Sequence, residues 1–319
     1  MHEDITMRTP LVSISIAKTI AKALLRKSTL PVIVALSVLF STNQLLADEN
    51  SVRSQQVSDS IYLLHGKGGN IGVSIGKDGT FLIDDKFAPM SENIIAEIKK
   101  LGGSIPKFVL NTHWHADHTG GNENLSREGS IIVAHKNVRK RLSSDNFLKA
   151  FNNEVKAYPE SALPLVTFTQ DIHFHINDDK IEILHIANAH TDGDSVAFFK
   201  TDNVLHTGDI FFNGFYPFID IDHGGSLKGM LDATDKLLTL VDDNTKIIPG
   251  HGPLANKKDL MAYREMLATA YLNLKAQKAM DKPLADVLKA KPLKDLDKQW
   301  GKGLFTSNKW IEIIYEGLD

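Results

Sequence analysis

The stretch that decides the fold directly follows a short apolar segment at residues 108–110. It reads Asn111-Thr112-His113-Trp114-His115-Ala116-Asp117-His118-Thr119-Gly120-Gly121. Three histidines and one aspartate give this stretch an H-x-H-x-D-H motif. In an extended segment, His113 and His115 project to the same side, so both imidazoles can reach one metal ion. Asp117 and His118 then point toward a neighbouring site, and the motif therefore predicts a metal centre.

Three more candidate ligands each follow a predicted strand in the same manner. They are His190, Asp209 and His251, each with a glycine close by in the sequence. The glycines allow the backbone and a metal to approach closely. The chain has no cysteine, which excludes disulfides, thiolate nucleophiles and iron–sulfur ligation. Any metal must therefore be held by histidine and carboxylate side chains.

Strand and helix patterns alternate around these residues. Residues 60–64 and 71–84 are predicted to form an antiparallel opening, with turn residues Lys77-Asp78-Gly79 inside the second segment. Further strands are expected at residues 108–110, 181–186, 195–199, 203–206 and 246–248, and helices at residues 91–101, at residues 227–238 and from residue 257 onward. Ser91 and Ser226 are the predicted N-caps of the first two helices. The pattern predicts an α/β fold with sheets in the middle and helices outside.

The composition and net charge limit the kind of partner that the chain can bind. The chain has 319 residues, of which 42% are hydrophobic and 24% charged, the balance of an ordinary globular protein. Its formal net charge is −3, and removal of the basic first 47 residues would make it more acidic. This argues against a nucleic-acid binder, which needs clustered Lys and Arg. We expect a small-molecule substrate, and the oligomeric state is left open.

The order of the candidate ligands resembles that of the metallo-β-lactamase superfamily, in which H-x-H-x-D-H is followed by a His, an Asp and a His, each after a strand. The resemblance covers about residues 60–255. It implies a four-layer αββα sandwich over residues 48–256, with residues 257–319 as a helical C-terminal extension packed on the same domain. Residues 208–220, together with residues 249–253, are similar to the exported zinc metallohydrolases associated with sulfur oxidation and quinoprotein systems.

The resemblance also implies a cofactor and a reaction. The cofactor is a pair of zinc ions, and the reaction is hydrolysis in which a metal-bridging hydroxide attacks a carbonyl-centred substrate of the β-lactam, lactone or thioester class. Asp117 would be the catalytic residue that orients this nucleophile and accepts its proton. The implied ligands are His113, His115 and His190 for one ion, Asp117, His118 and His251 for the other, and Asp209 as the bridge.

One departure from the lactamases bears on the substrate. Members similar to the commonest lactamase subclass have a cysteine where this chain has Asp209, and they use a downstream lysine for the substrate carboxylate. This chain has no lysine between Asp209 and Lys228, so lactam cleavage is expected to be secondary. Two alternatives stay open: a mononuclear iron oxygenase similar to persulfide dioxygenases, and a metal-binding protein without turnover.

Residues outside the motif supply weaker candidates. His223 is the best of the remaining histidines for contact with substrate, because it lies in the loop after Asp209. Asp84 and Asp85 end a predicted strand. We expect them to accept hydrogen bonds from metal-ligating histidines.

The first 47 residues differ in kind from the rest. Basic residues at positions 18, 22, 26 and 27 precede an apolar run at residues 30–40. The run is short for a membrane-spanning helix, which needs about 20 apolar residues. This pattern is typical of a signal peptide, residues 1–47, cleaved after Ala47. The mature protein would then be periplasmic without stable membrane insertion, and an uncleaved anchor is the alternative.

Overall fold

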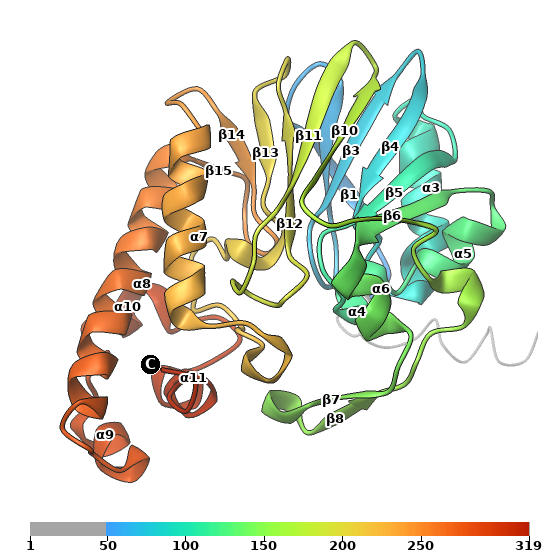
Figure 1. The fold of residues 1–319 in the computed structure, drawn as a ribbon. Coiled ribbons are helices and arrows are strands. Elements are labelled where there is room, and N and C mark those ends of the chain that lie inside the picture. Colours follow the sequence, from blue (N-terminus) through green and yellow to red (C-terminus); the bar gives the residue numbers. More distant parts are fainter. Residues whose placement is uncertain (1–48, 319) are drawn as a thin grey trace, which may run out of the picture. The chain divides into compact units, whose positions relative to one another are not determined.

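Two mixed β-sheets lie face to face at the centre of the computed structural model, which describes residues 49–318 (Figure 1). In strand order, the first sheet consists of β1 (Arg53–Gln56), β2 (Ile61–His65), β3 (Ile71–Gly76), β4 (Gly79–Ile83), β5 (Pro106–Asn111), β6 (Ile131–His135) and β9 (Val166–Phe168). The second consists of β10 (Asp171–Ile176), β11 (Asp179–His185), β12 (Ser195–Phe199), β13 (Val204–His206), β14 (Lys246–Ile248) and β15 (Ala255–Asn256). A separate two-stranded hairpin pairs β7 (Asn146–Leu148) with β8 (Asn153–Val155).

The direction of the strands decides which loops meet. Strands β1 to β4 form an antiparallel meander, whereas β4, β5, β6 and β9 run parallel to their neighbours. In the second sheet β13 and β14 are parallel. Parallel strands end at the same edge of a sheet. The segments that follow β4, β5, β13 and β14 therefore gather at one edge of the sandwich.

Helices cover the outer faces of both sheets (Figure 1). On the first sheet lie α3 (Ser91–Lys100) and α5 (Asn122–Arg127), with α4 (Ala116–Thr119) and α6 (Lys136–Leu142) near its edge. On the second lie α7 (Leu227–Leu240) and α8 (Lys257–Lys278), followed by α9 (Leu284–Ala290), α10 (Asp297–Trp300) and α11 (Ser307–Ile314). The predicted αββα sandwich with C-terminal helices is confirmed.

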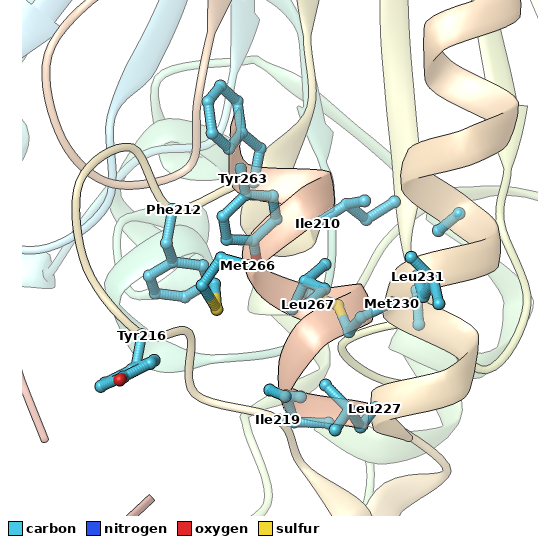
Figure 2. Close-up of a cluster of buried hydrophobic side chains, with 14 of the residues drawn as sticks. Ile210, Phe212, Tyr216, Ile219, Leu227, Met230, Leu231, Tyr263, Met266 and Leu267 are labelled. Atoms are coloured by element: carbon cyan, nitrogen blue, oxygen red, sulfur yellow. The ribbon is translucent and has the colours of Figure 1, made fainter. Parts of the chain in front are cut away.

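The core is divided by the sheets. Between them, Phe81, Leu110, Ile183 and Phe199 are fully buried in one cluster. Outside the second sheet, α7 and α8 pack against the loop that follows β13, and Figure 2 shows Leu227 and Met230 of α7 beside Leu267 of α8. Burying such side chains stabilises the fold by roughly 1.5–3 kcal/mol each.

The C-terminal helices share this outer core. Trp300 and Trp310 are buried in the same cluster as α7 and α8. The rings of Trp310 and Tyr216 stack with centroids 4.6 Å apart. Residues after α8 therefore pack on the loop that follows Asp209, although the boundary between residues 256 and 257 stays a prediction. The predicted signal peptide lies outside the described residues, and no helix among residues 49–318 is long and apolar enough to cross a membrane.

Two helix starts tested the capping predictions. Ser226 caps α7 as expected, because its side chain accepts a hydrogen bond from the backbone nitrogen of Gly229. Ser91 is instead the first residue of α3, with Met90 as the N-cap. A turn of 3-10 helix at Ala88–Met90 precedes it, and the Ser91 hydroxyl donates to the carbonyl of Ala88. The prediction for Ser91 was wrong because the chain already turns helically before it.

Candidate metal centre

Among residues 49–318, the side chains suited to hold a metal form two adjacent clusters at the edge where the parallel strands end. They are His113, His115, His190 and Asp209 in the first cluster, and Asp117, His118 and His251 in the second. Within each cluster the ligand atoms lie within 4.8 Å of one another. The structure brings all seven predicted residues together, divided between two neighbouring sites.

A change of direction after β5 separates the two halves of the motif. The strand ends at Asn111, and α4 begins at Ala116. The strand therefore ends before His113 and His115, although His115 keeps extended backbone angles, and their rings converge with centroids 4.8 Å apart. The short helix then directs the next two ligands of the motif toward the second cluster.

The remaining ligands come from loops of the second sheet. His190 lies between β11 and β12, in a turn held by Asp194, whose carboxylate accepts from the backbone nitrogens of His190 (2.7 Å) and Thr191 (2.8 Å). Asp209 lies in a 3-10 turn directly after β13, and His251 follows β14. Strand endings thus place each ligand, as the alternation of strands with histidine or aspartate predicted.

Hydrogen bonds orient the imidazoles from behind. Nδ1 of His118 donates to Asp84 (2.7 Å) and Nδ1 of His190 to the carbonyl of Phe218 (2.8 Å), which leaves Nε2 of each facing its cluster. His113 Nδ1 lies 3.0 Å from Thr112 Oγ1, whose hydroxyl donates to Asp84 (2.8 Å). Such partners fix the tautomer of a metal-ligating histidine.

The two aspartates after β4 have different roles. Asp84 accepts from a histidine, as predicted. Asp85 does not, because its carboxylate accepts from the backbone nitrogen of Gly121 (2.8 Å) and so holds the turn after the motif. The prediction for Asp85 was wrong, since adjacent residues in a chain leaving a strand point in different directions.

His115 is oriented by a residue that sequence reasoning did not identify. Its Nε2 lies 3.0 Å from Asp220 Oδ2, and the other carboxylate oxygen of Asp220 lies 2.7 Å from Nδ1 of His223. His223 is buried and supports Asp220 from behind, so its predicted contact with substrate was wrong. The loop turns inward there, where the backbone nitrogen of Asp220 donates to the carbonyl of His190.

Unpaired and closely facing atoms show that the clusters fit a metal. Nε2 of His113 is buried without a hydrogen-bond partner. Nδ1 of His115 and Nε2 of His190 face each other at 2.9 Å. Buried polar atoms normally have partners, and imidazole nitrogens that converge with a carboxylate are the donors a divalent transition metal accepts.

Asp209 lies between the two clusters. Its Oδ2 is 3.5 Å from Nε2 of His190 in the first cluster and 3.4 Å from Nε2 of His251 in the second. Its Oδ1 is 3.1 Å from Nε2 of His118. A carboxylate in this place can reach ions on both sides, which is the position expected of a bridging ligand.

The electrostatics of the two clusters match this arrangement. Burial, opposed by nearby Asp209, lowers the pKa of His190 to about 4, so that this imidazole is neutral and its lone pair is free. Burial alone would lower the pKa of His251, but the negative charges of Asp209 and Asp117 outweigh burial and raise this pKa to about 9. Burial also opposes ionisation of Asp209, yet His118 and His251 hold its pKa well below the usual range. Metal binding at the second cluster must therefore release a proton.

Asp220→Asn tests the support behind His115. The amide keeps the size of the side chain but removes the charge that accepts from His115 and His223. We expect affinity at the first cluster to fall by roughly 10- to 100-fold, measured by competition with a metal chelator. Asp222→Asn is the matched control, because Asp222 is exposed two residues away. Equal affinity in both variants would show that Asp220 does not support the site.

Gly69 packs directly against His118 of the second cluster. A Cβ at this position would lie 2.2 Å from Cε1 of His118, and the carbonyl of Gly69 accepts from the buried ammonium of Lys86. Burial lowers the pKa of Lys86 to about 8. The loop at residues 66–69 is therefore pressed against His118 and cannot accommodate a side chain there.

Gly69→Ala should displace His118 and lower affinity at the second cluster by about 10-fold or more, measured by chelator competition. Gly129→Ala is the control: its Cβ would meet nothing within 4 Å, although φ is +97°. This control is expected to lose roughly 1 kcal/mol of stability while keeping its metal. If Gly69→Ala bound metal as the parent does, His118 would not need its present position.

The clusters open into a cavity of about 600 Å³. Its polar floor consists of His115, Asp117, Asp209 and His251, and its walls are mainly aromatic and aliphatic. Asp117 and His251 are partly exposed (22% of each side chain), whereas His113, His118 and His190 are buried. A substrate entering this cavity would therefore meet Asp117 and His251 first.

Comparisons with known proteins match the fold and the site. The family model of the metallo-beta-lactamase superfamily matches residues 66–251. A hydroxyacylglutathione hydrolase from Pelagibacter ubique is 29% identical over 147 residues, 46% of this chain and 51% of that protein. A protein described as "Probable metallo-hydrolase YqgX" from Bacillus subtilis is 28% identical over 184 residues, 54% of this chain and 83% of its own. The chain thus spans about half the length of the first of these relatives.

Solved structures show the same fold. The DIM-1 metallo-beta-lactamase has a TM-score of 0.57 at 18% identity, covering 69% of this chain and 98% of that one. A metallo-beta-lactamase from Pontibacter korlensis has a TM-score of 0.55 at 22% identity, covering 68% and 99%. The family match spans more than half of the chain and includes the two metal-binding clusters. The chain belongs to the metallo-β-lactamase superfamily.

Proposed function

We propose that the protein is a zinc-dependent hydrolase that binds two Zn²⁺ ions and cleaves a small carbonyl-centred substrate of the lactone, thioester or β-lactam class. The observation that carries this proposal is the second cluster, Asp117, His118 and His251, adjoining the first with Asp209 between them. His113, His115 and His190 would hold one ion and the second cluster the other. Imidazole and carboxylate donors without cysteine suit zinc.

The metals and the chain contribute different parts of the chemistry. Two zinc ions, when bound, lower the pKa of a water molecule toward neutrality and polarise a carbonyl. Asp117 reaches the cavity floor, with Oδ2 3.3 Å from Nε2 of His251. Burial opposes its ionisation, but His118 and His251 hold its pKa below the usual range, so that it is a carboxylate. Asp117 therefore orients the attacking water and accepts its proton.

Asp209 bears on the choice among substrates. Lactamases of the commonest subclass carry a cysteine at this position, and this chain contains none. A relative named for the hydrolysis of hydroxyacylglutathione supports acyl cleavage outside the lactams. We therefore rank lactones and thioesters ahead of β-lactams.

The second cluster also bears on the two alternatives. A mononuclear iron oxygenase needs ligands for one ion, whereas Asp117, His118 and His251 converge on a second position. A binding protein without turnover needs no carboxylate on the floor of an open cavity, and Asp117 is there. Both features favour the hydrolase.

A turnover panel tests the proposal. The metal-loaded protein is offered a chromogenic β-lactam, a thioester, a lactone and a phosphodiester, before and after chelation and again after addition of zinc. We expect hydrolysis of at least one carbonyl substrate that chelation abolishes and zinc restores. Cleavage of the phosphodiester alone, or no turnover by protein with full metal content, would contradict the proposal.

Export and the narrower family placement are further proposals. The charge and apolar pattern of residues 1–47 supports a periplasmic protein, and residues 208–220 support kinship with the sulfur-oxidation-associated hydrolases. Expression in a bacterium with two membranes should yield a periplasmic protein whose first residue lies near Asp48. Amino-terminal sequencing measures this directly, and a cytosolic protein that retains residues 1–40 would refute export.

A further inference from the structure

The cavity above the metal-binding floor has apolar walls drawn from four separate parts of the chain. Phe87 follows β4, Leu148 and Phe151 belong to the β7–β8 hairpin, Phe215 and Phe218 lie in the loop after Asp209, and Leu304 comes from the C-terminal helical region. Figure 1 shows the β7–β8 hairpin below the two sheets, with α9 and α11 of the C-terminal region to its left. These parts lie far apart in the sequence, so their meeting at one cavity could not be predicted from it.

The aromatic rings form a continuous surface. The Phe151 ring meets Phe218 edge-on with centroids 4.9 Å apart, and Phe305 lies 5.8 Å from Phe151. The hairpin and the C-terminal region therefore meet at the cavity. Gly303 lets the C-terminal region also approach the loop after Asp209 closely, because a Cβ there would lie 2.3 Å from the Cβ of Phe215.

Exposure at the mouth indicates a binding surface. Phe151 is 43% exposed and Leu304 is 57% exposed, and both line the cavity. Apolar side chains that are exposed together at the entrance of a pocket are typical of ligand binding.

The scarcity of basic side chains on the cavity walls limits the kind of ligand that can bind. Among the residues that line the cavity, Lys67 is the only Lys or Arg. Its side chain is largely exposed, and its Nζ lies 3.4 Å from Oε2 of Glu49, so it already forms an ion pair with that carboxylate. A substrate carboxylate placed among the phenylalanines, away from His251 and the metal-binding floor, would have no lysine or arginine beside it, and burial of an unpaired charge is costly.

We propose that this cavity is an acyl-chain site: it binds an uncharged, extended aliphatic acyl group with its carbonyl on the metal floor, and Phe151 and Leu304 determine the preferred chain. The inference rests on the proposed hydrolase function and narrows its substrate class to thioesters or lactones of apolar acids. The β7–β8 hairpin and the segment around Leu304 are the specificity-determining walls.

A chain-length series measures this preference. The substrates are thioesters of 2-mercaptoethanol with acetyl, butanoyl, hexanoyl and octanoyl groups. We expect kcat/KM to rise by about threefold for each added methylene, slightly below the roughly fourfold that complete burial would give. The adipoyl thioester, which has the length of the hexanoyl one but ends in a carboxylate, should react at least about 100-fold more slowly than hexanoyl.

Variants at the mouth connect the preference to the named walls. Leu304→Ser and Phe151→Ser should flatten the series, reducing the octanoyl-to-acetyl ratio of kcat/KM by about 10-fold or more. Leu272→Ser is the matched control, because Leu272 is a 65% exposed leucine on α8 outside the cavity lining. This control should keep the parent ratio. A flat series in the parent, equal rates for adipoyl and hexanoyl, or an unchanged ratio in Leu304→Ser would overturn the inference.

A binding measurement separates this inference from the hydrolase proposal. Calorimetry with 2-decanone and 2-butanone, which are neutral and not hydrolysed, should show at least about 100-fold tighter binding of the longer ketone, lost in Leu304→Ser. If none of the carbonyl substrates is hydrolysed by protein with full metal content but this binding holds, the hydrolase proposal fails and the acyl-chain site stands. If hydrolysis occurs without preference for chain length or for 2-decanone, the acyl-chain site fails and the hydrolase stands.

Discussion

Asp209→Ala should empty both metal sites at once. The carboxylate lies within 3.5 Å of histidine nitrogens from each cluster, so its removal takes a ligand from both. We expect the metal content of the purified protein to fall from about two ions to well below one, measured by elemental analysis. Hydrolysis should fall with it.

Two further variants make this result specific to a bridging ligand. His190→Ala removes a ligand of the first cluster alone and should leave about one ion bound. Asp243→Ala removes a carboxylate that is 95% exposed and should leave the metal content unchanged. An Asp209→Ala protein that folds and retains two tightly bound ions would exclude the bridging role.

Asp117→Asn should lower kcat by about 100-fold or more, the lower end of what a general base contributes. The amide preserves size and still faces His251, but it cannot accept a proton from water. KM should change less than kcat, because the cavity walls are untouched. Steady-state kinetics on a substrate found in the turnover panel measure both.

Loss of metal could imitate this effect, because Asp117 is also a proposed ligand. The parent and the variant must therefore be compared at equal measured zinc content. Asp222→Asn, on the exposed side of the loop at residues 221–223, provides a control with the same chemical change away from the cavity. A metal-replete Asp117→Asn protein that works at the parent rate would exclude Asp117 as the catalytic base.

The clustering of the seven candidate ligands could be predicted from the sequence because each lies beside a strand with a recognisable local pattern. The motif at residues 113–118 is contiguous, and His190, Asp209 and His251 each follow a strand. Strand endings at a common edge then bring them together. The N-cap of α7 was equally local, since Ser226 and the helix it caps are adjacent in the sequence.

Features that depend on contacts across the chain could not be predicted. Asp220 lies 105 positions from His115 in the sequence, and nothing in its own sequence neighbourhood distinguishes it from other loop aspartates. The place of His223 in the loop after Asp209 predicts contact with substrate, but the loop folds inward and buries it. The approach of Phe151 and Leu304 to one cavity depends on how the hairpin and the C-terminal helices pack, and hydrophobic periodicity carries no information about that packing.

Reconstitution with zinc is the most direct test of a two-metal hydrolase. Metal-free protein is titrated with Zn²⁺ while bound metal and the hydrolysis rate are measured in the same samples. We predict that activity rises until about two equivalents are bound and then stays constant. Full activity in protein that holds one iron and no zinc, or in protein stripped of all metal, would contradict the two-zinc hydrolase.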